Sequence, residues 1–206
     1  MIREDSYFRM MRTRGFKAYI RRKKETKMKR IVLTFGLIAG VIVAVLGAIN
    51  MSLWRSGALD FDSGQLVGYT SMIIALSMVF FGIKSFRDKH QNGIIKFGKA
   101  FTVGILITLL ASAVYVAGWE VYWRTNDELR TTFMPQYMEH TIEKMKSGGA
   151  TAEDIEATRK QMMEFAEMYD ITAIRLAITL VEILPVGLVI TLISAAILRR
   201  REVLAQ

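Results

Sequence analysis

One carboxylate stands inside a long apolar stretch near the C-terminal end of the sequence. Glu182 is surrounded by Ile, Leu and Val residues and lies three positions before Pro185. A carboxylate in hydrocarbon is costly, so it faces the interior of a helix bundle or water and has a partner or a task. Pro185 lacks a backbone donor and its ring opposes the carbonyl of Val181, so we expect a helix break whose freed carbonyls can bind cations. Two interpretations stay open: a proton or cation site, or a structural hydrogen-bonded glutamate that fixes the helix register.

Three further polar residues are expected at a depth similar to that of Glu182. Arg175 precedes it by seven residues, which places both on nearly one helix face. Glu120 and Asn50 lie near the ends of two other apolar runs. The spacing predicts an ion pair of Arg175 with Glu120 or with Glu182, unless the arginine extends to the lipid headgroups instead. Together these four residues form a predicted intramembrane polar cluster.

Small residues recur every four positions in the first apolar run: Gly36, Gly40, Ala44 and Ala48. In lipid, such a ridge lets two helix backbones approach closely and gain dispersion contacts. We expect it to pack helices within the bundle. Self-association of two copies through Gly36 and Gly40, which would make a homo-oligomer, is the alternative.

No residue pattern predicts catalysis or a resident cofactor. His140 lies between Glu139 and Glu143, but one turn of a solvated acidic helix gives the same pattern, so we expect no metal there. The sequence has no cysteine, which excludes thiolate nucleophiles and cysteine-held metal clusters. Hydrolase, phosphate-loop, zinc-protease and dinucleotide motifs are missing as well. The sequence therefore predicts a protein that is not an enzyme.

The elements that position these residues follow from composition, because 52% of the 206 residues are apolar and they gather in runs long enough to cross a bilayer. The predicted fold is all-α, an integral membrane bundle of four transmembrane helices within a single domain over residues 31–200. The expected spans are residues 31–54, 65–83, 98–123 and 171–198.

The longest polar connection, residues 124–170, is predicted to form a helical hairpin outside the bilayer. Pro135 should interrupt the first helix, leaving residues 136–146, and Ser147 with two glycines should form the turn. Thr151 and Asp154 resemble a capping box that opens a second helix through about Asp170. That helix lacks a strong breaker before Pro185, so it can run on into the fourth span. An acidic hairpin of this size suits a protein partner.

Lys and Arg are distributed unevenly between the two sides of the predicted bundle. Residues 1–30 hold twelve, the 84–99 loop five and the C-terminus three, whereas the 55–64 loop holds one and the hairpin six against ten acidic residues. The positive-inside rule places both termini in the cytoplasm and the hairpin outside it. The basic tail, residues 1–30, is expected to meet anionic lipid rather than nucleic acid. Alternatively, residues 1–27 are an artefact of an upstream start, because Met28 opens a well-formed first span.

Five segments of the sequence together resemble a bacterial family known as domain of unknown function 4199. They are 28–40 (MKRIVLTFGLIAG), 68–72 (GYTSM), 81–88 (FGIKSFRD), 97–104 (FGKAF with Val103 and Gly104) and 182–195 (EILPVGLV with TLISA). The resemblance covers about residues 28–200 and implies a four-helix protein of the bacterial inner (cytoplasmic) membrane. It implies no activity. Family members usually open near Met28, so residues 1–27 depart from the pattern.

Two functions remain open from the sequence. The first is a non-enzymatic interaction or assembly subunit that binds a partner protein through the hairpin. The alternative is a small proton- or ion-coupled carrier or channel that uses Glu182 beside the Pro185 break, which would need a homodimer to complete a pathway.

Overall fold

The computed structural model describes residues 14–200, of which 14–24 are described as backbone only. This part of the chain is helical and contains no strand, as the sequence predicts for an all-α fold. Four stretches are long and apolar enough to span a membrane: Glu25–Arg55, Phe61–His90, Phe97–Thr125 and Thr172–Leu198. The helices are α2 (Arg14–Arg55), α3 (Phe61–Leu76), α4 (Met78–His90), α5 (Phe97–Thr125), α6 (Asp127–Ser147), α7 (Ala152–Asp170) and α8 (Thr172–Leu198).

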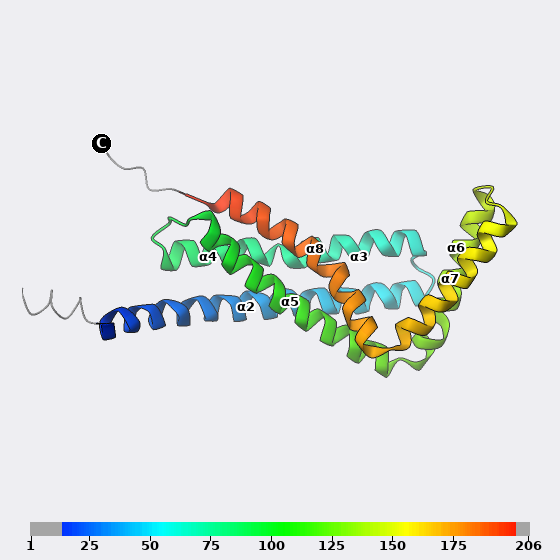
Figure 1. Ribbon diagram of the computed structural model, residues 1–206, viewed down its shortest axis with the longest axis horizontal. Coiled ribbons are helices and arrows are strands. Elements are labelled where there is room, and N and C mark those ends of the chain that lie inside the picture. The colour runs from blue at the N-terminus through cyan, green and yellow to red at the C-terminus, as the bar shows by residue number, and fades with distance from the viewer. Residues whose placement is uncertain (1–13, 201–206) are drawn as a thin grey trace, which may run out of the picture.

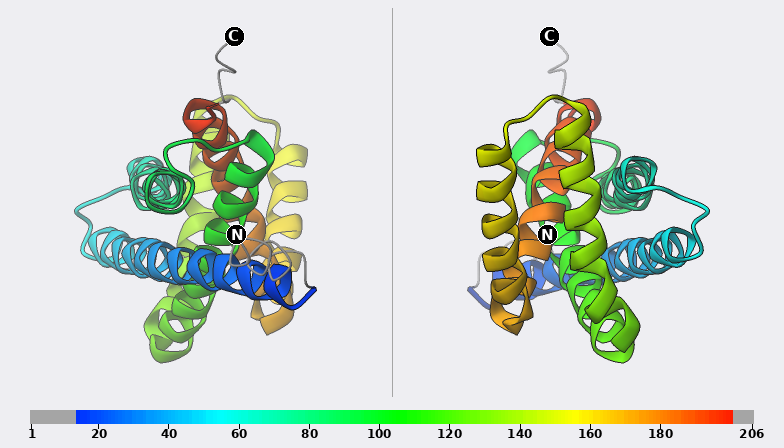
Figure 2. Two further views of the ribbon diagram at one scale, coloured as in Figure 1. Left: turned by 90° about the vertical axis from the view of Figure 1, so that its left-hand side faces the viewer. Right: turned by 90° about the vertical axis from the view of Figure 1, so that its right-hand side faces the viewer.

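The spans lie side by side, and the two ends of the bundle differ (Figure 1). The start of α2, the α4–α5 loop and the end of α8 share one end, which we call the terminal end. The α2–α3 loop and the pair α6 and α7 share the other, which we call the hairpin end. The views along the bundle show α3 and α4 to one side of α5 and α8 (Figure 2). The side chains of residues 1–24, which are most of the basic tail, are not among those described. The predicted contact of the tail with lipid therefore falls outside the described residues.

The ridge of small residues on α2 faces α5 of the same chain. A Cβ added at Gly36 would lie 2.8 Å from Leu110 Cδ2, and one at Gly40 would lie 2.5 Å from Val114 Cβ. Farther along, a Cβ at Gly118 would lie 3.0 Å from that of Ala44. Ala48 borders a small hollow in the same α2–α5 seam. Gly36 and Gly40 are buried by this contact, so within the described chain their surface is covered by α5.

A second close approach joins α5 to α8 in the half of the bundle near the terminal end. The hydroxyls of Thr108 and Thr191 lie 2.9 Å apart, and the side chain of Thr108 occupies the space that a Cβ at Gly187 would need. Fully buried apolar side chains surround this contact, among them Ile83, Ile107 and Ile183. The terminal half of the bundle is therefore close-packed.

Neither internal proline ends a helix, contrary to the sequence prediction. Pro135 lies inside α6, and Pro185 lies inside α8, which continues from Thr172 to Leu198. Each proline removes one backbone hydrogen bond. The carbonyls that lose their donor belong to Thr131 and Val181, which lie on exposed helix faces. Pro185 is flanked by Ile183 and Gly187, both buried, and their packing keeps the helix continuous.

The second hairpin helix ends at Asp170, as predicted, and does not take the alternative course of running on into the fourth span. α7 ends at Asp170, and Ile171 adopts an extended backbone with φ −75° and ψ 114° before α8 begins. The guanidinium of Arg175 turns back and donates to the carbonyls of Tyr169 at 2.9 Å and Asp170 at 3.4 Å. Carbonyls at the end of a helix lack intrahelical donors, so this side chain stabilises the end of α7.

The turn and the helix cap that the sequence predicts for the hairpin are both present. Thr151 Oγ1 accepts a hydrogen bond from the Asp154 amide at 3.1 Å, and its hydroxyl donates to Asp154 Oδ2 at 2.7 Å, which confirms the predicted cap of α7. Gly149 has a φ of +79°, a conformation that glycine adopts without strain. The second span is longer than predicted and divides at Ser77 into α3 and α4.

Candidate binding cavity

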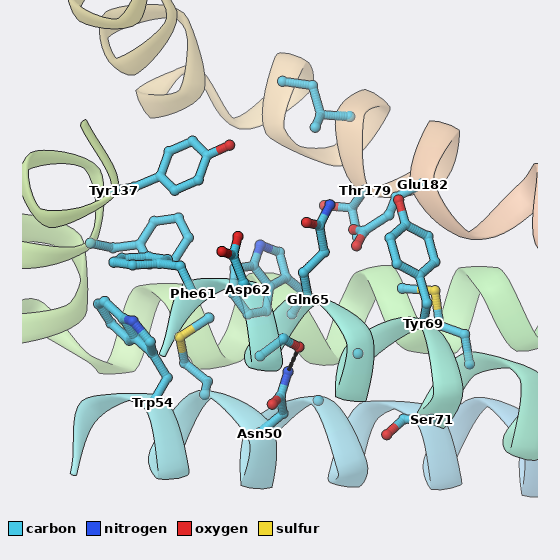
Figure 3. A pocket seen from close by; sticks show the side chains of 18 of the residues that line it. Asn50, Trp54, Phe61, Asp62, Gln65, Tyr69, Ser71, Tyr137, Thr179 and Glu182 are labelled. Atoms are coloured by element: carbon cyan, nitrogen blue, oxygen red, sulfur yellow. Dashed lines mark hydrogen bonds between the residues drawn. The ribbon is translucent and has the colours of Figure 1, made fainter. Parts of the chain in front are cut away.

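The hairpin half of the bundle contains a partly open cavity of about 620 Å³. Side chains from α2, α3, α5 and α8 form its walls, and α6 and α7 contribute residues where it meets the hairpin. Figure 3 shows the cavity between α2 and α3 on one side and α8 on the other. Its volume lies in the range of sites that hold small molecules in proteins.

Glu182 lies at the inner end of the cavity. Gln65 and Tyr69 of α3 and Thr179 of α8 converge on the same space (Figure 3). Thr179 donates its hydroxyl to the Arg175 carbonyl at 2.9 Å, which holds its methyl and oxygen in place. Among the described side chains, those of residues 25–200, none pairs with the Glu182 carboxylate, so the carboxylate faces the cavity without a counter-charge.

Asn50 connects two walls of the cavity. Its amide nitrogen donates to the Gly64 carbonyl at 2.9 Å, which fixes the start of α3 against α2. Its Oδ1 is buried and has no hydrogen-bond partner in the described chain. Gly68, one turn farther along α3, lies beside this amide, and a Cβ there would make an ordinary contact at 3.5 Å from its nitrogen.

The outer end of the cavity is bounded by charged groups that join α3 to α6. Lys144 Nζ lies 2.9 and 2.8 Å from the two oxygens of Asp62, and His140 Nε2 lies 3.8 Å from Oδ1. The helix start beside them is capped by Asp60, and the hydrogen bond from the Ser63 amide lowers the pKa of that carboxyl. Among the described residues, no group of three or more His, Cys, Asp or Glu side chains is arranged to hold a metal ion.

Aromatic rings cover the wall between the two ends. Trp54 and Phe61 have ring centroids 4.9 Å apart, Trp54 and Phe133 5.3 Å, and Phe61 and Tyr137 5.5 Å. Their contacts bring together the end of α2, the start of α3 and the hairpin. Figure 3 shows Trp54, Phe61 and Tyr137 gathered at the end of the cavity opposite Glu182.

The predicted pair of Arg175 and Glu120 is present beside the cavity. Arg175 Nε and Nη2 donate to the two oxygens of Glu120 at 2.9 and 3.0 Å, and Arg124 Nε reaches the same carboxylate at 2.5 Å. Arg175 is only 3% exposed, so it does not extend to the headgroups. Its guanidinium carbon lies 5.5 Å from the centroid of Trp123. The pair is fully satisfied and joins α5 to the α7–α8 junction, which is a structural role.

Tyr169 separates this ion pair from the cavity. Its hydroxyl accepts a hydrogen bond from Trp119 Nε1 at 2.9 Å, and its ring lies 5.1 Å from that of Trp123. Burial raises the pKa of Tyr169 to about 12, so the phenol stays neutral at physiological pH. It therefore presents an uncharged wall to the cavity.

The four polar residues of the predicted cluster thus divide into two sites. Asn50 and Glu182 line the cavity, whereas Glu120 and Arg175 form the closed ion pair. Sequence reasoning missed Gln65, whose amide inside an apolar run was a usable signal. It also assigned Trp54 and Tyr69 no cavity role, because aromatic residues near span ends are equally typical of a membrane interface.

The chemistry that the cavity offers depends on the groups that line it. Its inner end offers one carboxylate together with neutral hydroxyl and amide groups. Covalent catalysis needs a nucleophile and a base within hydrogen-bond reach of each other. Glu182 has no such pairing among the described residues, so the cavity provides charge, hydrogen bonds and apolar contact.

Four apolar spans, a helical hairpin at one end and a solute-sized cavity beneath it define a multi-pass helical membrane protein. Within that class, the chain belongs to the family described as Protein of unknown function (DUF4199), whose family model matches residues 34–200. This match confirms the resemblance found in the sequence. No curated protein and no solved structure matches the chain.

Proposed function

We propose that this chain is a non-enzymatic protein of the bacterial inner membrane that binds a solute in the cavity, with Glu182 as the binding carboxylate. The observation that carries the proposal is a carboxylate with no counter-charge in the described chain, at the inner end of a cavity of about 620 Å³. Glu182 is the eleventh residue of α8, so it lies about 15 Å along that helix. A carboxylate retained at such depth has a task.

The proposed orientation places the hairpin end outside the cytoplasm. The terminal end gathers the basic start of α2, the 84–99 loop and the arginines after α8. Positive charge is retained on the cytoplasmic side of membrane proteins. The cavity then receives its solute from the extracytoplasmic side.

The packing of the terminal half supports a closed inner end. Beyond Glu182 the bundle is filled by Ile183, Ile107 and the Thr108–Thr191 contact. In this conformation the binding site would be accessible from the extracytoplasmic side only, like a carrier that faces outward. Transfer to the other side would require α5 and α8 to separate along that seam.

The proposal is tested by the reactivity of single cysteines, because the natural chain has none. Glu182→Cys places a thiol at the inner end of the cavity. Val181→Cys is the matched control: it is the adjacent residue, and Val181 is 71% exposed on the outer face of α8. A membrane-impermeant methanethiosulfonate reagent added from the hairpin side should modify Glu182→Cys much faster than Val181→Cys. Equal, slow rates would show that no aqueous path reaches Glu182 and would refute the proposal.

A second candidate function, an interaction subunit, is favoured by the outer face of α7. Met163 and Met168 are 56% and 46% exposed there, whereas Phe165 lines the cavity. If this face binds a partner, Met163→Glu should abolish stoichiometric co-purification of that partner from native membranes. Glu164→Gln is a control on the same helix, and it should leave the complex intact.

A further inference from the structure

The cavity has an unbalanced negative charge at its inner end. The cations beside the cavity already have carboxylate partners: Arg175 shares Glu120 with Arg124, and Lys144 is paired with Asp62. Glu182 therefore has no cation to share within the described chain. A cationic ligand would supply the missing charge, whereas an anionic ligand would be repelled.

The walls of the cavity are suited to an organic cation. Trp54, Phe61, Tyr69 and Tyr137 present aromatic rings to the space that leads to Glu182 (Figure 3). Ring faces attract ammonium groups and also bury apolar groups. Near the carboxylate, Gln65 and Tyr69 add polar atoms that can bond to N–H groups.

Size and ligand number argue against a bare ion. A cavity of about 620 Å³ is far larger than the ~30 Å³ that one water occupies in the liquid. Calcium takes six to eight oxygen ligands and magnesium needs near-octahedral geometry, but the inner end offers one carboxylate. An ion alone would leave most of the cavity and its aromatic walls unused.

We infer that the ligand of this cavity is a small organic ammonium ion that carries an apolar group. The inference rests on the proposed function and specifies its ligand class. The ammonium group pairs with Glu182, and the apolar group lies against the aromatic wall. Two sources supply this chemistry: a free amine from the extracytoplasmic side, or the ethanolamine headgroup of a phospholipid.

The first test compares two probes that share a ring and chain length. 2-Phenylethylamine is protonated at pH 7, and 2-phenylethanol is its neutral counterpart. Binding to the full chain in phosphatidylcholine nanodiscs is followed by tryptophan fluorescence, because Trp54 and Trp119 line the cavity.

The ammonium probe should bind at least about tenfold more tightly than the alcohol, the ratio expected for one ion pair. Glu182→Gln should remove this preference, and Glu143→Gln should retain it. Equal binding of the two probes to the natural chain would overturn the inference.

The second test uses protection of a cysteine and keeps Glu182 intact. 2-Phenylethylamine should slow modification of Gln65→Cys by the methanethiosulfonate reagent, and 2-phenylethanol at the same concentration should not. If Gln65→Cys is modified quickly but neither probe protects it, the ligand class is wrong while the proposed aqueous cavity stands. If the thiol is unreactive, the proposed function itself fails.

The lipid composition of the nanodisc distinguishes the two sources. With a lipid source, replacing part of the phosphatidylcholine by phosphatidylethanolamine should itself protect Gln65→Cys and weaken the binding of 2-phenylethylamine. With a free amine as the source, the two nanodiscs should give the same rate and affinity. Either result supports an ammonium ligand, provided that the preference over 2-phenylethanol is present.

Discussion

Two carboxylates within the spans have opposite surroundings. Glu120 accepts three charge-assisted hydrogen bonds, two from Arg175 and one from Arg124. Glu182 has no ionic partner in the described chain and faces a cavity. A carboxylate charge in hydrocarbon needs a partner. The charge of Glu120 is balanced by protein side chains, whereas that of Glu182 is left to whatever fills the cavity. This contrast separates a structural residue from a binding residue.

We predict that Glu120→Gln destabilises the protein by about 3 kcal/mol, because it leaves the buried guanidinium of Arg175 without its counter-charge. The measurement is equilibrium unfolding in mixed micelles. Glu128→Gln is the matched control, since Glu128 pairs with Arg55 at a side-chain exposure of 70%, and exposed pairs contribute about 0–1 kcal/mol. A loss for Glu120→Gln no larger than for Glu128→Gln would contradict the structural role.

The sequence was sufficient to propose the Arg175–Glu120 pair but not to choose it over Arg175–Glu182. Seven residues along one helix bring Arg175 and Glu182 to one face, and that spacing alone makes the two pairs equivalent. The choice depends on where α7 ends, because Arg175 turns toward the carbonyls of Tyr169 and Asp170. That turn directs its guanidinium toward α5 and away from the cavity.

At the scale of elements, α2 and α5 pack closely because Gly36 and Gly40 have no side chain to keep the two helices apart. We predict that Gly40→Ala destabilises the bundle by about 1–3 kcal/mol. The added Cβ would lie 2.5 Å from Val114 Cβ and 2.9 Å from the Ala111 carbonyl oxygen, and that backbone atom cannot turn aside.

Gly98→Ala is the control for this substitution in the same unfolding measurement. Gly98 lies in the first turn of α5, and an added Cβ there meets no atom within 4 Å. Alanine favours helix over glycine, so Gly98→Ala should be neutral or slightly stabilising. If both substitutions have the same effect, close packing at Gly40 is not what holds α2 against α5.

The elements that the sequence predicts well are those set by local residues. Apolar length gives the four spans, and Thr151 with Asp154 gives the start of α7. The errors arise where distant contacts decide. Pro135 and Pro185 lack a donor, but both helices continue through them, and at Pro185 the buried neighbours Ile183 and Gly187 hold α8 in place. The end of α7 near Asp170 was predicted, but its stabilisation by a side chain five residues later was not, because that contact depends on how the helices pack.

At the scale of the whole molecule, the two ends of the bundle should lie on opposite sides of the membrane. We predict that Ser147→Cys, in the exposed end of the hairpin, reacts with an impermeant maleimide added to intact spheroplasts. Lys89→Cys, exposed in the last turn of α4 at the terminal end, should react only after permeabilisation. The physical reason is the excess of Lys and Arg at the terminal end. The opposite labelling pattern would reverse the proposed orientation.

The cavity is a property of the whole molecule, and the sequence did not predict it. It arises because the helices are close-packed around Thr108 and Gly187 but separate toward the hairpin. Residues from six helices line it, and no single segment contains its pattern. Glu182 was recognisable from its apolar neighbours, whereas the aromatic wall required the fold.

In the proposed function a ligand enters the cavity from the hairpin end and stops at Glu182, so its binding is sensitive to voltage. A charge that enters the cavity moves through part of the transmembrane electric field, which amounts to about 2.3 kcal/mol per elementary charge for a full crossing of 100 mV. In the proposed orientation an inside-negative potential draws a cation toward Glu182. Occupancy then rises when the cell is energised and falls when the potential collapses, although no part of the protein moves.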